Sequence, residues 1–116
     1  MRHTLTLGML ALLLFAAGAQ AQSVTLDHAE YVGFWTIQRV GGATQWALLV
    51  KIDGGIMPVL IKNQNTAWYW HDNLTSGDLI TVYGNLKSIR YIEIDGTIKR
   101  TWVVERGSVS NWIIKH

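Results

Sequence analysis

Alternation of apolar and polar positions dominates the chain from residue 31 onward, and this pattern is typical of β-strands. Aromatic and β-branched residues gather in short runs that Gly-Gly or Asp-Gly steps separate. Helical periodicity is scarce, so the predicted fold class is all-β. We expect strands over residues 31–40, 45–52, 56–62, 78–86, 88–94 and 97–105, with an edge strand over 111–116.

Two of these runs predict which side chains face the interior. In residues 78–86, one face carries Ile80, Val82, Gly84 and Leu86. In residues 45–52, the more apolar face carries Trp46, Leu48, Val50 and Ile52. Pro58 lies in the third run and has no N–H for a neighbouring strand, so it indicates an edge position or a bulge.

Residues 63–77 break the alternation and leave two structures open. Asn65 or Thr66 could cap a short helix over residues 67–74, which would place residues 67, 70, 71 and 74 against one end of the fold. If the segment is instead extended, Trp68 and Trp70 point the same way and form an aromatic platform. The sequence does not decide whether residues 66–74 are helix or loop.

Closure is the expected solution for a chain with so many strands, because open strand edges promote aggregation. Gly33 and Gly84 fall inside predicted strands, where small barrels bend sharply. We therefore expect a small closed barrel of five to six strands, with a short helix or loop between strands 3 and 4. An OB-like barrel is favoured, and an SH3-like or lipocalin-like barrel is the alternative.

The first 21 residues have the pattern of a secretory signal peptide. Arg2 gives a positive start, an apolar run follows over residues 5–17, and Ala19-Gln20-Ala21 is an A-x-A cleavage site. The run is shorter than the roughly 20 residues that span a bilayer. We predict cleavage after Ala21, an N-terminal arm over residues 22–30, and a single domain over residues 31–116. The expected location is the periplasm or the extracellular medium, with no transmembrane segment in the mature chain.

A family resemblance rests on two short segments. Residues 76–86 (SGDLITVYGNL) resemble the fourth strand of OB domains, where a Gly-Asp turn leads into a hydrophobic run with a central glycine. Residues 50–54 (VKIDG) look like the hairpin between strands two and three of that fold. With the leader, the chain is similar to small exported bacterial OB-fold proteins over about residues 31–106. The resemblance implies a ligand-binding barrel in the periplasm and carries over no catalytic residue.

Composition and charge narrow the function further. The 116 residues are 49% hydrophobic and 16% charged, which excludes a disordered polar chain. The absence of cysteine excludes disulfides, thiolate zinc sites and a cysteine nucleophile. Removing Arg2 with the leader leaves nine basic residues against eight acidic ones. A dedicated nucleic-acid binder usually has a clearer positive excess, so we do not expect nucleic acid as a partner.

No motif for catalysis or cofactor binding is present. The chain has no G-x-S-x-G elbow, no P-loop and no dinucleotide-binding glycine pattern. His28, His71 and His116 lack the spacing of metal ligands. We therefore expect no enzyme, no cofactor and no metal.

Six tryptophans are more than the interior of a small barrel accommodates. We expect Trp46 and Trp102 inside and the others at the ends or on the surface. Aromatic faces beside Arg or Lys bind sugar rings, bases and peptides. We therefore predict a binding module for a small ligand, a glycan or a protein, with a site drawn from Trp68, Trp70, Arg39, Lys51, Lys62 and Tyr83.

Two other functions remain as alternatives. The barrel could be a structural subunit of an envelope complex or a homo-oligomer, with the surplus aromatic residues buried at an interface. The weaker alternative is binding of single-stranded nucleic acid, against which export and near-neutral charge both argue.

Overall fold

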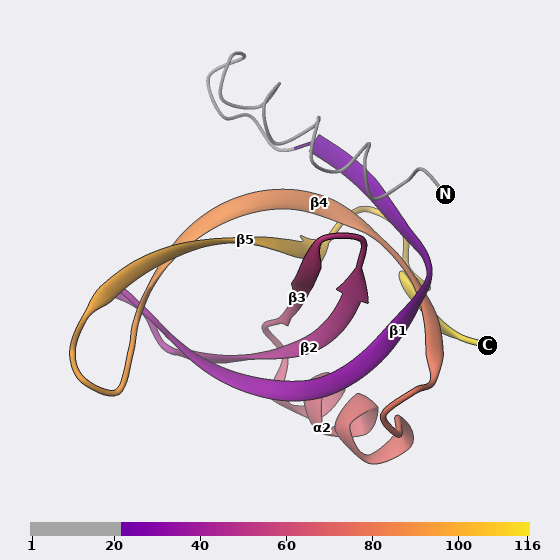
Figure 1. Cartoon of the computed structure of the whole chain (residues 1–116), viewed down its shortest axis with the longest axis horizontal. Coiled ribbons are helices and arrows are strands. Elements are labelled where there is room, and N and C mark those ends of the chain that lie inside the picture. The colour runs from indigo at the N-terminus through magenta and orange to yellow at the C-terminus, as the bar shows by residue number, and fades with distance from the viewer. Residues whose placement is uncertain (1–21) are drawn as a thin grey trace.

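Most of the chain is β-strand, as the alternating pattern predicts (Figure 1). The computed structural model describes residues 22–116, and the predicted signal peptide over residues 1–21 lies outside them. The described part contains six strands and one helix: β1 (Gln22–Arg39), β2 (Thr44–Ile52), β3 (Gly55–Ile61), α2 (Gln64–Asn73), β4 (Leu79–Ile92), β5 (Ile98–Arg106) and β6 (Ile113–Lys115). Within these residues, no helix is long and apolar enough to cross a bilayer.

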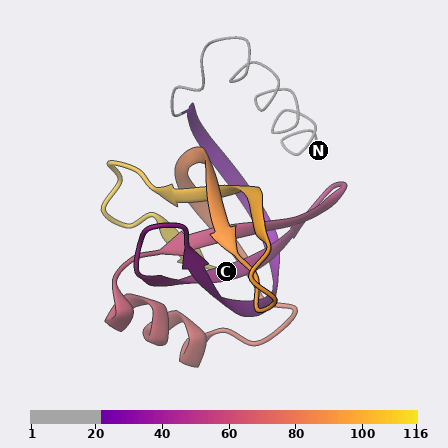
Figure 2. The ribbon, with the colours of Figure 1, turned by 90° about the vertical axis from the view of Figure 1, so that its left-hand side faces the viewer.

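The five long strands form a closed ring of pairings. Their order is β1-β2-β3-β5-β4, and β1 also pairs with β4, so that each has two neighbours. The short strand β6 joins the first residues of β4. Figures 1 and 2 show this ring from two sides, with α2 lying against one end of it.

Strand β1 is long because it pairs with two neighbouring strands, β4 and β2. Its first half lies beside β4, from the pair Gln22–Leu86 to the pair Glu30–Leu79. Its second half lies beside β2, from Glu30–Lys51 to Gln38–Thr44. At its end β1 meets β4 again, with Arg39 opposite Tyr91. This double pairing closes the ring.

The predicted N-terminal arm over residues 22–30 is therefore wrong, because these residues are the first half of β1. Val24, Leu26 and Ala29 are buried in the main core. Polar residues stand between them, and His28 interrupts the alternation with a positive φ of 51°. This interruption hides the strand pattern, which explains why the sequence alone suggested a loose segment.

Side chains from the two faces of the strands form two apolar cores. The main core holds most of the buried residues, including the predicted inner sets of β2 and β4: Leu48, Val50, Ile80, Val82 and Leu86. Trp46 and Ile52 pack against it from partly buried positions. The second core contains Ile37, Leu60, Ile89 and Val103. Val59 and Leu60 belong to different cores because neighbouring side chains in a strand point to opposite faces.

Gly33, Gly84 and Pro58 each have a distinct structural setting in the ring. The register between β1 and β2 shifts between Tyr31 and Gly33, which is a β-bulge. A side chain at Gly84 would place its Cβ 2.6 Å from Cγ1 of Val104 and closer still to the carbonyl oxygen of Glu105. Pro58 lies in the stretch of β3 that pairs with β2 before the pairing with β5 begins at Val59.

Two predicted boundaries need correction. The expected strands 78–86 and 88–94 are one continuous strand, because Lys87 and Ser88 pair with Val103 and Trp102 instead of forming a turn. The helix in the insert is confirmed, but its cap is Asn63, whose Oδ1 accepts a hydrogen bond from the backbone N–H of Thr66 at 3.0 Å. The predicted caps, Asn65 and Thr66, both lie within the helix, and Thr66 donates the hydrogen bond that Asn63 accepts.

The C-terminal residues are fastened to β1 and β4. The ring of His116 stacks on that of His28 with centroids 3.8 Å apart, and Nε2 of His116 lies 2.6 Å from the buried Oγ1 of Thr81. Lys115 Nζ lies 3.5 Å from Oδ2 of Asp78 at the start of β4. The same Asp78 oxygen accepts a hydrogen bond from the backbone N–H of Thr75. These contacts fix β6 against β4.

Replacing Gly84 with alanine should lower the free energy of unfolding by about 1–3 kcal/mol, because the new methyl group would press on β5. Gly33→Ala is the matched control, since its Cβ would meet Leu49 at an ordinary contact distance of 3.9 Å. Urea denaturation compares the two variants. Equal losses in both would contradict the close approach of β4 and β5.

Asp78→Asn should make stability less dependent on pH. The Thr75 N–H and, secondarily, the Lys115 ammonium hold the pKa of Asp78 below its ordinary value of 3.8. The carboxylate therefore stabilises the fold above pH 3.8, and this contribution is lost as the pH falls through the lower folded value. We expect the variant to be less stable than wild type at pH 7 and the difference to shrink in acid, measured by urea denaturation across pH. A difference that stayed constant would argue against these contacts.

Candidate functional site

The aromatic platform that an extended segment would give does not form, because residues 64–73 are helical. Trp68 is 42% exposed, whereas Trp70 and Tyr83 are partly buried and pack against the main core. Ala67 and Leu74 are buried in that core. The prediction that a helix would place residues 67, 70 and 74 against the fold is therefore confirmed. His71 differs, since it is exposed and contacts other aromatic rings.

The three predicted basic residues are held in different local environments. Arg39 donates to Oε1 of Gln45 at 3.0 Å, near the end of the β1–β2 hairpin. Lys51 is exposed on β2 and lines a shallow groove with Asp27 and Glu30. Lys62 follows β3 and borders a small pocket. Of the six residues predicted to bind a ligand, all of which the structure describes, Lys62 alone lines this pocket.

An aromatic cluster connects α2 with β1. The rings of Phe34 and Trp68 stack with centroids 5.5 Å apart. His71 meets both edge-on, at 4.7 Å from Phe34 and 5.1 Å from Trp68. The neighbouring Tyr69 is 58% exposed and contacts Trp70 instead. This cluster presents aromatic surface but few polar groups that could orient a ligand.

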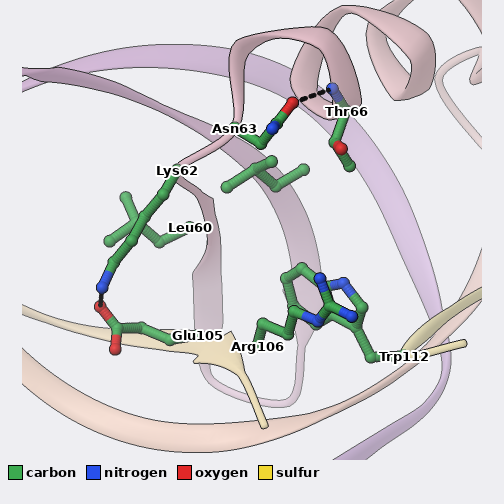
Figure 3. A pocket seen from close by; sticks show the side chains of 8 residues that line it. Leu60, Lys62, Asn63, Thr66, Glu105, Arg106 and Trp112 are labelled. Carbon is green, nitrogen blue, oxygen red and sulfur yellow. Dashed lines mark hydrogen bonds and ion pairs between the residues drawn. The ribbon is translucent and has the colours of Figure 1, made fainter. Parts of the chain in front are cut away.

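The pocket beside Lys62 combines apolar and charged walls (Figure 3). It has a volume of about 170 Å³. Its lining comes from the end of β3, the start of α2, the end of β5 and the residue before β6: Leu60, Ile61, Lys62, Asn63, Thr66, Glu105, Arg106 and Trp112. Segments far apart in the sequence therefore meet at this place. We call it the α2–β5 pocket.

Glu105 is the most constrained polar group of the α2–β5 pocket. Its backbone lies between Leu60 of β3 and Asn85 of β4 in the pairing, and its side chain is only 15% exposed. Lys62 Nζ lies 3.7 Å from Oε2, and Lys87 Nζ lies 3.6 Å from Oε1. Both distances exceed those of a hydrogen bond, which extend to about 3.2 Å for N–H···O. Among the described residues, the buried Oε2 receives no hydrogen bond.

An unsatisfied carboxylate oxygen is costly to bury, which makes this atom notable. The two lysines provide charge compensation without satisfying its lone pairs. A ligand that brings an O–H or N–H group into the pocket could satisfy Oε2. Because Oε2 has almost no accessible surface, such a group reaches it only if a neighbouring side chain, such as the exposed Lys62, moves aside.

Trp112 forms the apolar end of the pocket and is itself held firmly. Its carbonyl oxygen accepts a hydrogen bond from the backbone N–H of Tyr83 at 2.8 Å, and Ile113 pairs with Val82 next to it. Of the six tryptophans, all within the described residues, Trp112 alone is buried. Trp46 and Trp102, which we expected inside, are only partly buried against the main core.

The sequence predicted one of the eight lining residues, Lys62, and the missed residues include Glu105, Arg106 and Trp112. One signal was present, because Glu105 directly follows the buried pair Val103 and Val104 in a predicted strand. A carboxylate at such a place is often partly buried and paired. The approach of α2 and of residue 112 depends on tertiary structure, which no local pattern reveals.

A second, wider hollow lies between the β1–β2 and β4–β5 hairpins, with a volume of about 560 Å³. Trp35 and Tyr91 meet edge-on there at 5.2 Å, and Ile94 is fully exposed beside it.

Within residues 22–116, no group of three or more His, Asp or Glu side chains is placed to hold a metal ion.

Comparison of the chain with protein-family models, curated proteins and solved structures found no match.

Trp68→Phe should remove much of the quenching of tryptophan fluorescence by acrylamide, because the Trp68 ring is exposed. Trp112→Phe is the matched substitution at a buried ring and should leave the quenchable fraction nearly unchanged. If quenching is the same with and without Trp68, this ring is covered in solution, as an assembly interface would require.

Proposed function

We propose that the protein is an exported, non-enzymatic binding module that holds a small polar ligand in the α2–β5 pocket. The observation that carries the proposal is the buried Oε2 of Glu105, which lacks a hydrogen-bond donor among the described residues. Lys62 Nζ lies 3.7 Å from this oxygen, and a second cationic side chain, Arg106, lines the same pocket together with an apolar floor. Such a combination of apolar surface with a few convergent polar groups is typical of ligand sites.

The size of the pocket limits the ligand. Clefts for drug-sized molecules have volumes of about 300–1,000 Å³. The α2–β5 pocket, at about 170 Å³, suits a smaller molecule or one terminal group of a larger one. This favours a single sugar ring or a small organic acid over a folded protein surface.

An OB-like barrel is the architecture that we propose for this module. The chain order of three strands, a helix and two further strands supports it, as does the ring of pairings. The predicted leader supports export. In OB domains, ligands usually meet the face of strands 2 and 3 and the adjoining loops, whereas the α2–β5 pocket lies where β3 passes into α2.

The assembly alternative rests on a separate observation, the exposed rings of Trp68 and Tyr69 on α2. Aromatic residues are enriched in protein interfaces. We favour ligand binding because the aromatic cluster has few polar groups, whereas the α2–β5 pocket contains an unsatisfied buried oxygen.

A panel of amino acids, monosaccharides, sugar acids and organic acids should contain a compound that shifts the indole N–H resonance of Trp112 in ¹H–¹⁵N NMR spectra. Arg106→Gln should weaken this binding, because Arg106 lines the pocket. The matched control is Arg100→Gln, another exposed arginine of β5 that bonds instead to Ser88. Absence of any binder, or equal binding to both variants, would contradict the proposed site.

A further inference from the structure

The ring of strands leaves one side of the first part of β1 open. Residues 22–29 lie beside β4, and the pairing of β1 with β2 begins only at Glu30. Within residues 22–116, no strand pairs with the other side of residues 22–29. This part of β1, drawn in indigo, projects beyond the ring in Figure 2, so a second chain can approach it.

A bulge sets the length of this open segment. Asp27 and His28 stand between the pairs Leu26–Val82 and Ala29–Ile80, where β4 has one residue. His28 has the positive φ of 51° that interrupts the strand. The regular part of the segment is therefore residues 22–27, which we call the open edge of β1.

An open edge has unused hydrogen-bonding groups. Successive residues of a strand point their N–H and C=O groups alternately to its two sides, so part of those in residues 22–27 point away from β4. Such a row of backbone groups is a template for pairing with another extended chain.

The open edge of β1 lacks the features with which proteins block such pairing, namely basic residues, proline or a very short strand. Its sequence is QSVTLD. Other exposed edges of the ring have these features. Before its pairing with β3, β5 includes Lys99 and Arg100. The part of β3 before its pairing with β5 includes Pro58, and β6 is only three residues long.

A second copy of this chain fits the open edge by symmetry. In a two-fold dimer, a strand pairs with itself in antiparallel direction. If Thr25 lies on the axis, Val24 faces Leu26 of the second copy and Ser23 faces Asp27 of the second copy. Apolar residues then meet apolar residues, and no two like charges are opposed.

Neighbouring registers fit less well. An axis at Val24 would place Leu26 opposite the polar Gln22, and an axis at Leu26 would place Val24 opposite His28, where the strand is interrupted. An axis at Asp27 would oppose two carboxylates, which is unfavourable. Thr25 is also exposed, so its side chain does not obstruct the pairing.

We propose that the protein forms a two-fold symmetric dimer in which the open edges of β1 pair with each other, with Thr25 on the axis. One sheet then continues from β4 and β1 of one copy into β1 and β4 of the other. The contact is short and its exposed face is polar, so the dimer is weak and forms at micromolar or higher concentration. No residue of β1 lines the α2–β5 pocket, so dimerisation and ligand binding are separate properties.

Sedimentation of the purified protein between about 1 µM and 1 mM tests the dimer. The mass of the wild-type protein should rise from that of a monomer to that of a dimer. Thr25→Lys and Thr25→Glu should each weaken dimerisation at least about tenfold, because each places two like charges on the axis. An equal mixture of these two variants should recover the dimer, since an ammonium group then faces a carboxylate.

The matched control is Thr36→Lys. Thr36 is another exposed threonine of β1, but β2 already pairs with the strand at this position. This variant should dimerise like the wild type. Circular dichroism and thermal unfolding confirm that each variant is folded.

Three results would overturn the proposal. A wild-type protein that stays monomeric up to about 1 mM would exclude self-pairing and leave the edge to an extended segment of another protein. A dimer that Thr25→Lys does not weaken would use a different surface. If both charged variants are monomeric and their mixture is monomeric too, the two copies do not meet at Thr25.

Discussion

The structure depends on the sharing of β1 between two neighbouring strands. A strand that paired with β2 alone would leave β4 and the first residues of β1 with open edges, which proteins avoid. The bulge near Gly33 bends β1, so that its first half lies beside β4 and its second half beside β2. The ring that results separates the apolar side chains into two cores, one on each face of the strands.

The closed ring also fixes the candidate site. Strand β5 lies between β3 and β4, so the backbone of Glu105 is paired on both sides, which fixes the point from which its side chain leaves the sheet. Gly84 permits the close approach of β4 to β5 at this residue. The lysines at positions 62 and 87 compensate the charge, but they leave one oxygen without a hydrogen bond. A buried oxygen without a hydrogen bond costs stability in the free protein.

The sequence predicted the fold better than the site. Alternation within β2 and β4 correctly assigned inner residues such as Leu48 and Val82. Gly33 marked a real bulge, and Pro58 lies where β3 pairs with β2 but not yet with β5. Residues 22–30 were misjudged because the positive φ of His28 breaks the two-residue period of β1. Of the predicted binding residues, Lys62 lines the pocket, whereas Trp70 is partly buried because the helix packs it against the core. Local patterns report which face a side chain occupies, and they do not report that β3, α2, β5 and Trp112 converge.

Hydrogen exchange of the backbone amides is the most direct test of the closed ring. If β1 completes the ring, the amides of residues 24–30 that face β4 should exchange as slowly as those of their partners in residues 79–84. Exchange of residues 24–30 at the rate of an unstructured chain, with β2 and β3 still protected, would show that the ring is open and would contradict this account.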